Sequence, residues 1–405
     1  MSERAVTQYL TQYAEVECML LHSAPAFHYQ ASVVIPAYKE STTFLQRFLQ
    51  QYGEQSVLLI AVVNQPDTDD NITPQSDLCE FIASSFELRW QHENIALYHQ
   101  FSGNIGILLV DRFSTERRIP AKQGVGLARK IGADIASYLI AQKQIDCPWV
   151  GSTDADAILP QDYFAQLNSK HLAGAKAATF AFSHIVNGDP SIFSATRLYE
   201  QWLHYYKKGL AWAGSPYAFY TIGSCLAFDY QGYCQVRGFP KRAGGEDFYL
   251  LNKMAKLAPV VELDACIHLQ SRVSDRVPFG TGPAVQKIIE QQSDETQYLV
   301  YNPQVFVQLK SLLQLFNTLF ESCSNESLPD WMNALSQASR NALMQSSFEQ
   351  AVLKIKGNCK NQHQFLQQVH GWFDGFRTLK YIHALENDFS PVCLQQAREI
   401  APFEF

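Results

Sequence analysis

Two aspartates that follow a short apolar run are the first residues in this 405-residue chain with clear potential for chemistry. The run Trp149 to Thr153 is typical of a β-strand, and Asp154 and Asp156 come directly after it. In an open α/β sheet, ligands bind beyond the carboxyl ends of the strands, so we expect these carboxylates at a ligand crevice. Two carboxylates suit Mg²⁺ or Mn²⁺, which keeps water and phosphate oxygens at its other positions. The alternative is an acidic turn in which Asp156 caps the next helix.

A second acidic pair lies at the start of a predicted helix. Gly244 and Gly245 precede Glu246 and Asp247, and the helix is predicted over 248–257. The helix dipole favours the ionised form of a carboxylate at this place. The structural alternative is an N-cap that Asp247 forms together with Glu246.

The elements that must position these carboxylates alternate along the first 160 residues. Compact apolar runs predict strands at 32–36, 57–63, 105–111 and 149–153, as expected for strands that are covered on both faces. Apolar residues at helical spacing predict helices between them. Because β-α-β units imply parallel strands with right-handed crossovers, the sequence predicts a doubly wound, nucleotide-binding half.

A glycine-rich stretch opens the long helix predicted at about 124–141. Gly124 and Gly126 would let backbone N–H groups approach an anion closely. Gly132 is interpreted instead as a site of tight helix–strand packing. The pattern is neither a Walker loop nor a dinucleotide-binding fingerprint.

Composition and targeting signals exclude several classes of protein. The net charge is −7, so no global basic field recruits nucleic acid. The nine cysteines form no C-x-x-C pair, which favours reduced thiols in the cytoplasm. The N-terminus lacks the pattern of a signal peptide, and no stretch reaches the roughly 20 apolar residues that span a bilayer. We expect a soluble cytoplasmic protein without a transmembrane segment, with peripheral membrane contact left open.

Several short motifs together resemble the inverting nucleotide-sugar transferases of glycosyltransferase family 2, which have the GT-A fold. In chain order they are Val-Val-Ile-Pro-Ala-Tyr-x-Glu at 33–40, Gly-Leu-Ala-Arg-Lys-x-Gly at 126–132, Asp-Ala-Asp at 154–156, Gly-Phe-Pro at 238–240 and Gly-Glu-Asp at 245–247. The resemblance covers about residues 32–275.

The resemblance implies which residues bind the nucleotide-diphosphate sugar. The residues that would cradle its nucleoside are Pro36, Ala37, Tyr38 and Glu40. Asn64, or an acid at 67–70, would hold the base or ribose, since Asn64-Gln65-Pro66 replaces the family's acidic doublet. Lys122 and Arg129 would face the phosphates or the base, and a surface position on the helix is the alternative for Arg129.

The metal site and the catalytic base also follow from the resemblance. Asp154 and Asp156 would hold a divalent ion at the diphosphate, and His268 matches a third ligand, with a structural histidine as the alternative. Asp247, with Glu246 beside it, matches the base that takes the proton of an acceptor hydroxyl as its oxygen attacks the anomeric carbon.

The loop at 271–282 is interpreted as a lid. Arg272 and Arg276 lie four residues apart and precede Gly280 and Gly282, which permit hinge motion. Guanidinium groups match phosphate oxygens, so this loop would close over the diphosphate. The alternative is a surface loop whose arginines pair with Asp275 or Glu262.

The predicted fold is α/β of the GT-A (Rossmann-like) type, with a mixed, mainly parallel sheet flanked by helices and a C-terminal all-helical appendage. Its parts are a helical lead-in (1–31), a nucleotide-sugar-binding half (32–160), an acceptor and catalytic half (161–283) and a helical region (284–405). In the acceptor half, the aromatic residues Trp202, Tyr205 and Tyr206 are interpreted as core rather than as a substrate platform.

The expected function is metal-dependent transfer of a sugar, as by a hexosyltransferase, from a nucleotide-diphosphate donor to an acceptor hydroxyl with inversion. The acceptor class stays open between a small molecule, a glycan and a lipid. The alternatives are a retaining GT-A transferase of the glycosyl-glycerate type, a sugar-phosphate nucleotidyltransferase, and an inactive nucleotide-sugar-binding protein.

Overall fold

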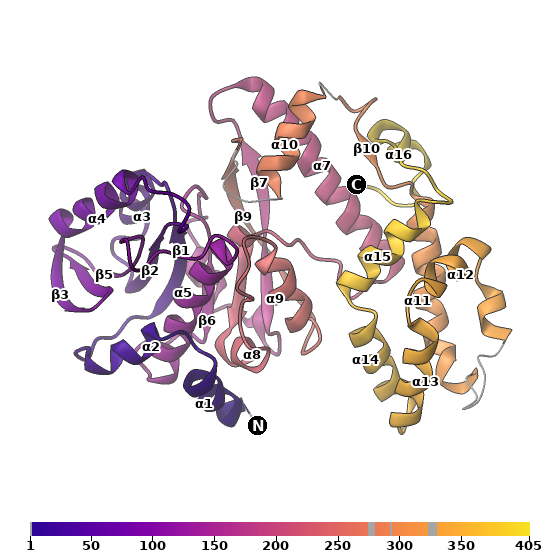
Figure 1. Ribbon diagram of the computed structural model, residues 1–405, viewed down its shortest axis with the longest axis horizontal. Coiled ribbons are helices and arrows are strands. Elements are labelled where there is room, and N and C mark those ends of the chain that lie inside the picture. The colour runs from indigo at the N-terminus through magenta and orange to yellow at the C-terminus, as the bar shows by residue number, and fades with distance from the viewer. Residues whose placement is uncertain (1, 274–279, 292–293, 323–329) are drawn as a thin grey trace. The chain divides into compact units, whose positions relative to one another are not determined.

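The chain divides into two compact units. The computed structural model describes residues 2–273, 280–291, 294–322 and 330–405. One unit consists of residues 1–188 and 221–283, and the other of residues 189–220 and 284–405 (Figure 1). Residues 189–220, which the sequence placed in the acceptor half, therefore belong to the second unit together with the C-terminal helices.

The first unit is built on a nine-stranded sheet in the order β3-β4-β5-β2-β1-β6-β8-β7-β9. The strands are β1 (Ala31–Ala37), β2 (Val57–Asn64), β3 (Phe86–His92), β4 (Ile95–Gln100), β5 (Ile105–Arg112), β6 (Trp149–Ser152), β7 (Ala177–Ile185), β8 (Leu226–Asp229) and β9 (Val261–Gln270). β1 is parallel to β2 and β6, β2 to β5, and β7 to β9. β3, β4 and β8 run antiparallel to their neighbours. The predicted mixed, mainly parallel sheet is confirmed.

The central strands are apolar because helices cover the sheet. Every residue of β1 and β2 is buried. The helices of this unit are α1 (Ser2–Gln12), α2 (Glu17–Leu20), α3 (Thr43–Tyr52), α4 (Thr73–Ser85), α5 (Gly124–Ala141), α6 (Tyr163–Gln166), α8 (Tyr230–Gln235) and α9 (Glu246–Met254). α5 packs on β1, β2 and β6. A Cβ atom at Gly132 would lie 2.3 Å from Cγ1 of Val34, so the packing interpretation of this glycine is confirmed.

An antiparallel hairpin of β3 and β4 at the sheet edge was not predicted. The side chains of β3 are mostly exposed or half-buried, and Glu93 makes the turn with a positive φ of 48°. An edge strand needs few apolar residues because only part of its surface is covered. For that reason residues 86–92 carry no apolar run that would mark a strand in the sequence.

A buried polar network attaches the N-terminal helix to the sheet unit. Asp134 of α5 has no exposed surface. Its carboxylate accepts hydrogen bonds from Tyr9 Oη at 2.6 Å, Tyr233 Oη at 2.8 Å and the Glu15 N–H at 2.8 Å, and pairs with Lys130 Nζ at 2.6 Å. A buried carboxylate is tolerated only when such partners replace water, so the helical lead-in is part of this unit's core.

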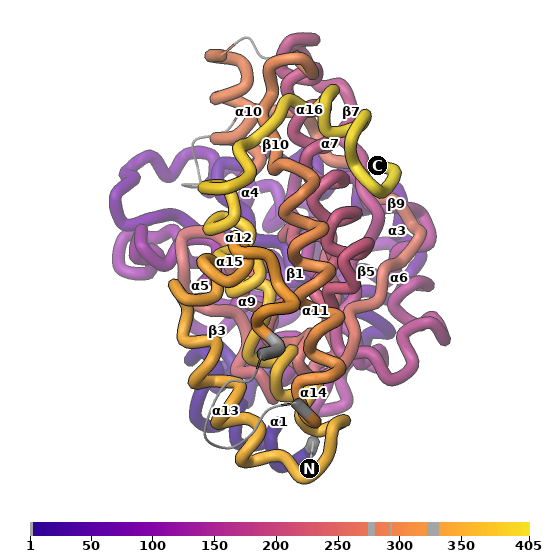
Figure 2. Tube along the Cα trace, turned by 90° about the vertical axis from the view of Figure 1, so that its right-hand side faces the viewer, coloured from indigo at the N-terminus to yellow at the C-terminus, as the bar shows by residue number. Residues whose placement is uncertain are grey.

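The second unit is helical. Its helices are α7 (Pro190–Ala213), α10 (Thr281–Glu290, whose first residues belong to the first unit), α11 (Gln304–Ser322), α12 (Gln337–Met344), α13 (Phe348–Asn358), α14 (Gln362–Trp372), α15 (Gly375–Leu385) and α16 (Leu394–Ile400). Two short strands, β10 (Leu299–Val300) and β11 (Val392–Cys393), form a small antiparallel pair. α11 packs along α7 (Figure 2).

The aromatic residues of α7 contribute to the core of this unit. Tyr205 is fully buried, and Trp202 and Tyr206 are half-buried against the same cluster. Gly209 allows the ring of Phe306 to approach, since a Cβ atom there would lie 2.7 Å from it. These contacts agree with the core interpretation of Trp202, Tyr205 and Tyr206.

Within the described ranges, no helix has both the length and the apolar character needed to cross a membrane.

Replacing Asp134 with alanine is expected to lower the free energy of unfolding by about 3 kcal/mol or more, because the charge of Lys130 then loses its buried partner. Tyr9→Phe removes one donor and is expected to cost about 1.5–3 kcal/mol. Urea denaturation of the full chain measures both, with the exposed Asp77→Ala as a control. Equal midpoints for Asp134→Ala and Asp77→Ala would show that the network does not stabilise the fold.

Candidate functional site

The predicted Asp-Ala-Asp motif forms a turn at the carboxyl end of β6. The Thr153 N–H bonds to the carbonyl of Val34 in β1, and the Ala157 N–H bonds to the carbonyl of Asp154. The side chains of Asp154 and Asp156 are 33% and 18% exposed. Asp156 does not cap a helix, because the next helix begins at Tyr163. The alternative interpretation of Asp156 as a helix cap is therefore wrong.

Arg129 joins this turn to the Gly-Glu-Asp motif. Its side chain is 3% exposed, so the alternative of a surface residue is wrong. Nη2 donates to Asp154 Oδ1 at 2.6 Å and Nε donates to Glu246 Oε1 at 2.9 Å. Nη1 donates to Ser152 Oγ at 3.0 Å. Burial by itself would lower the pKa of Arg129, but the charges of Asp154, Glu246 and Asp247 outweigh it and raise that pKa.

Two residues from a later segment complete the surroundings of Asp154. A Cβ atom at Gly223 would lie 2.4 Å from Arg129 Nη2, so only glycine leaves room for the guanidinium. Ser224 Oγ donates a hydrogen bond to Asp154 Oδ2. Both oxygens of Asp154 are therefore oriented by neighbouring side chains.

Asp247 lies at the start of α9 beside the buried Glu246. Gly245, with a φ of 72°, is the N-cap, and no side chain caps the helix. Asp247 Oδ1 accepts the Phe248 N–H at 2.6 Å. Burial and the charge of Glu246 raise the pKa of Asp247 to about 7. The N-cap alternative for this pair does not describe the structure, because Gly245 is the N-cap.

Arg272, which follows β9, brings a second guanidinium to the turn. Its Nη2 lies 2.7 Å from Asp156 Oδ2 and 3.2 Å from Glu40 Oε1, and its side chain is 33% exposed. Arg272 thus pairs with Asp156 and Glu40. The alternative of a surface arginine that pairs with Asp275 or Glu262 does not describe it. Arg276 and Asp275 lie outside the described residues.

The residues expected to cradle the nucleoside lie at the ends of β1 and β2. Pro36 and Ala37 are the buried last residues of β1. Tyr38 Oη and Lys39 Nζ lie 2.6 Å and 2.9 Å from Asp69 Oδ2. These two donors hold the pKa of Asp69 at about 2.

The remaining residues predicted to contact the donor differ in their partners and in their burial. Asp67 accepts the Ala121 N–H at 2.8 Å, and Asp70 pairs with Arg118 at 2.6 Å. Asn64 is buried, and its Oδ1 has no hydrogen-bond partner among the described residues. Lys122 is exposed.

The glycine-rich start of α5 is covered by backbone. The Gly126 N–H donates to the carbonyl of Arg242 at 2.9 Å. A Cβ atom at Gly126 would lie 2.5 Å from that oxygen and 2.6 Å from the carbonyl oxygen of Pro240. At Gly126 the glycine permits packing of two chain segments, and its N–H does not face an open anion site.

His268 is tied to the Asp-Ala-Asp turn through its backbone. Its N–H and carbonyl pair with those of Ile158 at 3.0 and 2.8 Å. The exposed ring places Nδ1 2.8 Å from Ser183 Oγ on β7. In the part of the chain that the structure describes, no group of three or more His, Cys, Asp or Glu side chains is arranged to hold a metal ion.

The two aspartates alone fit the donor set of a hard divalent ion. Mg²⁺ in particular is bound through one or two carboxylates with the remaining positions on water and phosphate. Asp154 and Asp156 are both partly exposed and lie two residues apart on one turn, and each is paired with a cation, Arg129 or Arg272.

Three further residues, which were not predicted from the sequence, contact this turn or its strand: Arg47, Ser152 and Ser224. Arg47 of α3 donates to the carbonyls of Ala155 and Ala157. The sequence contains an indication that Arg47 has a buried partner, because this cation lies between Phe44 and Phe48 on the apolar face of its helix. Ser152 and Ser224 carry no local pattern that marks them.

No family model matches the chain, and no curated protein matches it. Among solved structures it is similar to a mannosyltransferase from Pyrobaculum calidifontis in complex with GDP-Man and Mn²⁺, at 16% identity and a TM-score of 0.37, over 96% of this chain and 95% of that one.

The raised pKa of Asp247 predicts a pH-dependent stability. The folded pKa of about 7 lies above the ordinary 3.8, so the native state binds more protons than the unfolded chain between those values, and stability falls as the pH rises through that window. Asp247→Asn has no titrating carboxyl at this position, so this fall in stability with rising pH is absent from the variant. Its stability relative to the parent is expected to rise by about 2–3 kcal/mol from pH 5 to pH 8, because about two pH units separate pH 5 from the folded pKa.

Urea denaturation at several pH values measures this difference, with Asp77→Asn as the exposed control. A difference that stays constant over this range would contradict the raised pKa of Asp247.

Proposed function

We propose that this protein is a metal-dependent glycosyltransferase of the GT-A type, similar to family 2, that moves a hexose from a nucleotide-diphosphate donor to an acceptor hydroxyl. The observation that carries the proposal is Arg129. This one buried cation pairs with Asp154 on the proposed donor side and with Glu246, which precedes the proposed base Asp247. The proposed leaving-group site and the proposed base site are therefore connected by the same buried side chain, that of Arg129.

Asp247 is proposed to take the proton of the acceptor hydroxyl. As the hydroxyl oxygen forms its bond to the anomeric carbon, the bond from that carbon to the diphosphate oxygen breaks, and the nucleoside diphosphate leaves with its electron pair. Attack opposite the leaving group inverts the anomeric centre. A base is most effective when its pKa lies near the working pH, and the pKa of about 7 for Asp247 meets that condition.

Asp154 and Asp156 are proposed to hold a divalent cation, Mn²⁺ or Mg²⁺. When bound, such an ion stabilises the negative charge that develops on the departing diphosphate. Glu246 would act by holding Arg129 in place. His268, the third ligand that the resemblance implies, forms no cluster with the two aspartates among the described residues, and its Nδ1 lies beside Ser183 Oγ.

The remaining donor contacts are proposed for the strand ends. Pro36, Ala37, Tyr38, Glu40 and Asn64 would surround the nucleoside, and Lys122 and Arg272 would face the phosphates. Arg272 is suited to this role because its fork-shaped guanidinium matches phosphate oxygens. Arg129 is instead enclosed by its carboxylate partners, Asp154 and Glu246. The described cysteines are all free thiols, which fits the proposed location in the cytoplasm.

Asp156→Ala is expected to abolish sugar transfer and the Mn²⁺-dependent part of nucleoside-diphosphate binding, because the cation loses a ligand. A thermal-shift screen of nucleoside diphosphates with and without Mn²⁺ identifies the nucleotide, since a bound ligand raises the midpoint. Asp162→Ala, an exposed aspartate near the turn, is the control. Normal turnover and metal-dependent binding in Asp156→Ala would rule out this site.

Asp247→Asn is expected to lower kcat by roughly 10²–10⁴ because it removes the proton acceptor. Donor affinity should stay within about twofold of the parent. In the parent, kcat/KM should rise with pH to a plateau, with an apparent pKa near 7, because kcat/KM reports the pKa of the base in the free enzyme. Proton NMR of the product reads the anomeric configuration, and retention would favour the retaining alternative. A variant with parental kcat would exclude Asp247 as the base.

A further inference from the structure

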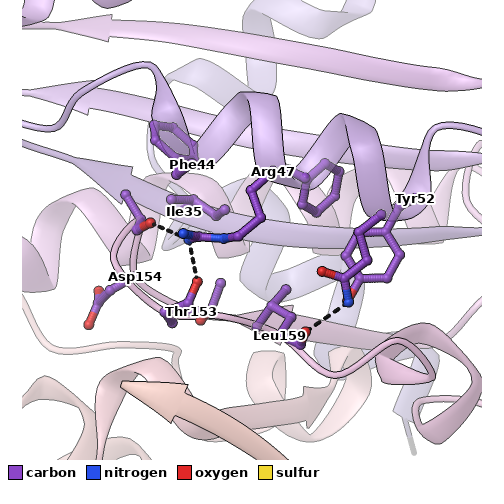
Figure 3. Close-up of a pocket in the computed structure, with 11 residues that line it drawn as sticks. Ile35, Phe44, Arg47, Tyr52, Thr153, Asp154 and Leu159 are labelled. Carbon is purple, nitrogen blue, oxygen red and sulfur yellow. Dashed lines mark hydrogen bonds between the residues drawn. The ribbon is translucent and has the colours of Figure 1, made fainter. Parts of the chain in front are cut away.

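Arg47 of α3 donates hydrogen bonds to the backbone of the turn that carries Asp154 and Asp156. Arg47 Nη2 lies 3.2 Å from the carbonyl oxygen of Ala155 and 2.8 Å from that of Ala157 (Figure 3). One nitrogen therefore donates to the two carbonyls that flank Asp156 in the chain.

Two further side chains at the end of α3 continue this contact. Gln51 Nε2 donates to the carbonyl of Leu159 at 2.8 Å, and Tyr52 Oη donates to that of Pro160 at 2.6 Å. Gln51 follows Arg47 by four residues and lies on the same helix face. On the other side, the backbone of Ile158 pairs with that of His268. The irregular segment after β6 is thus held by hydrogen bonds on both sides.

The guanidinium of Arg47 is partly buried where it contacts the turn. The guanidinium lines a cavity that has room for about one water molecule, and its walls include Ile35, Phe44 and Phe48. Burial lowers the pKa of Arg47, while the charge of Asp156 raises it. Hydrogen bonds to carbonyls are stronger where water is partly excluded than in bulk water.

We infer that Arg47 is a positioning residue that raises the divalent-cation affinity of Asp154 and Asp156 by fixing the backbone of their turn. The inference rests on the metal site of the proposed function. Groups that orient metal ligands typically change metal affinity 10–100-fold when they are removed.

The charge of Arg47 would act in the opposite direction. A cation beside a cation site repels the incoming ion, so loss of this charge alone would strengthen binding. Positioning predicts weaker binding when Arg47 is replaced, and the sign of the change separates the two effects.

The test is Mn²⁺ binding to the full chain without nucleotide, followed by electron paramagnetic resonance of the free ion. Arg47→Met is expected to weaken binding by about tenfold or more. Arg47→Lys keeps the charge but lacks the planar fork, so its affinity should fall between that of the parent and that of Arg47→Met. Arg89→Met, which removes an exposed arginine from β3, should bind like the parent.

Asp156→Ala makes failures of the two proposals distinguishable. If Asp156→Ala binds Mn²⁺ like the parent, the proposed metal site is wrong. If Asp156→Ala loses Mn²⁺ but Arg47→Met binds it as tightly as the parent or more tightly, only the inference about Arg47 is wrong.

Thermal unfolding of both Arg47 variants separates positioning from a purely structural role. A lower midpoint with parental Mn²⁺ affinity would overturn the inference. If Arg47→Met does not fold, Arg47→Lys decides, and parental affinity in that variant counts against positioning.

Discussion

The burial of one guanidinium is the constraint around which the site is arranged. Removing a charge from water costs several kcal/mol, and Arg129 is tolerated because carboxylates and hydroxyl oxygens replace that water. Its partners come from two distant segments: Asp154 is 25 residues away and Glu246 is 117 residues away along the chain. Gly223 leaves the space that the guanidinium fills. Local changes at any of these positions therefore affect the turn of Asp154 and Asp156 and the helix of Asp247 together.

The two guanidiniums at the site differ in how freely they can exchange partners. Arg129 is enclosed, with 3% of its side chain exposed, so its ion pairs belong to the fold. Arg272 is 33% exposed and comes from the chain after β9, so water can take the place of its contacts to Asp156 and Glu40 at lower cost. Arg129 thus has fixed partners, whereas Arg272 can exchange its carboxylate partners for water more easily.

Much of the sheet could be predicted from the sequence, and part of the site could not. β1, β2 and β5 are continuous apolar runs, which reveal strands that are covered on both faces. The β3–β4 hairpin could not be predicted in this way, because an edge strand needs no continuous apolar run. Asp154 and Asp247 lie in short local motifs, but the burial of Arg129 depends on partners that no local pattern connects to it. Arg47 acts through carbonyl groups, which every residue possesses, so no pattern of side chains reveals the positions that it contacts.

The interleaving of the two units has a consequence for synthesis on the ribosome. α7 is made within the first unit's chain, yet its buried Tyr205 packs with Phe306, roughly 100 residues later. At about 5–20 residues per second, its apolar face waits for roughly 5–20 s before α11 emerges. During this interval β8 and β9 appear and can complete the sheet. All strands of the sheet are therefore synthesised before the helix that packs against α7.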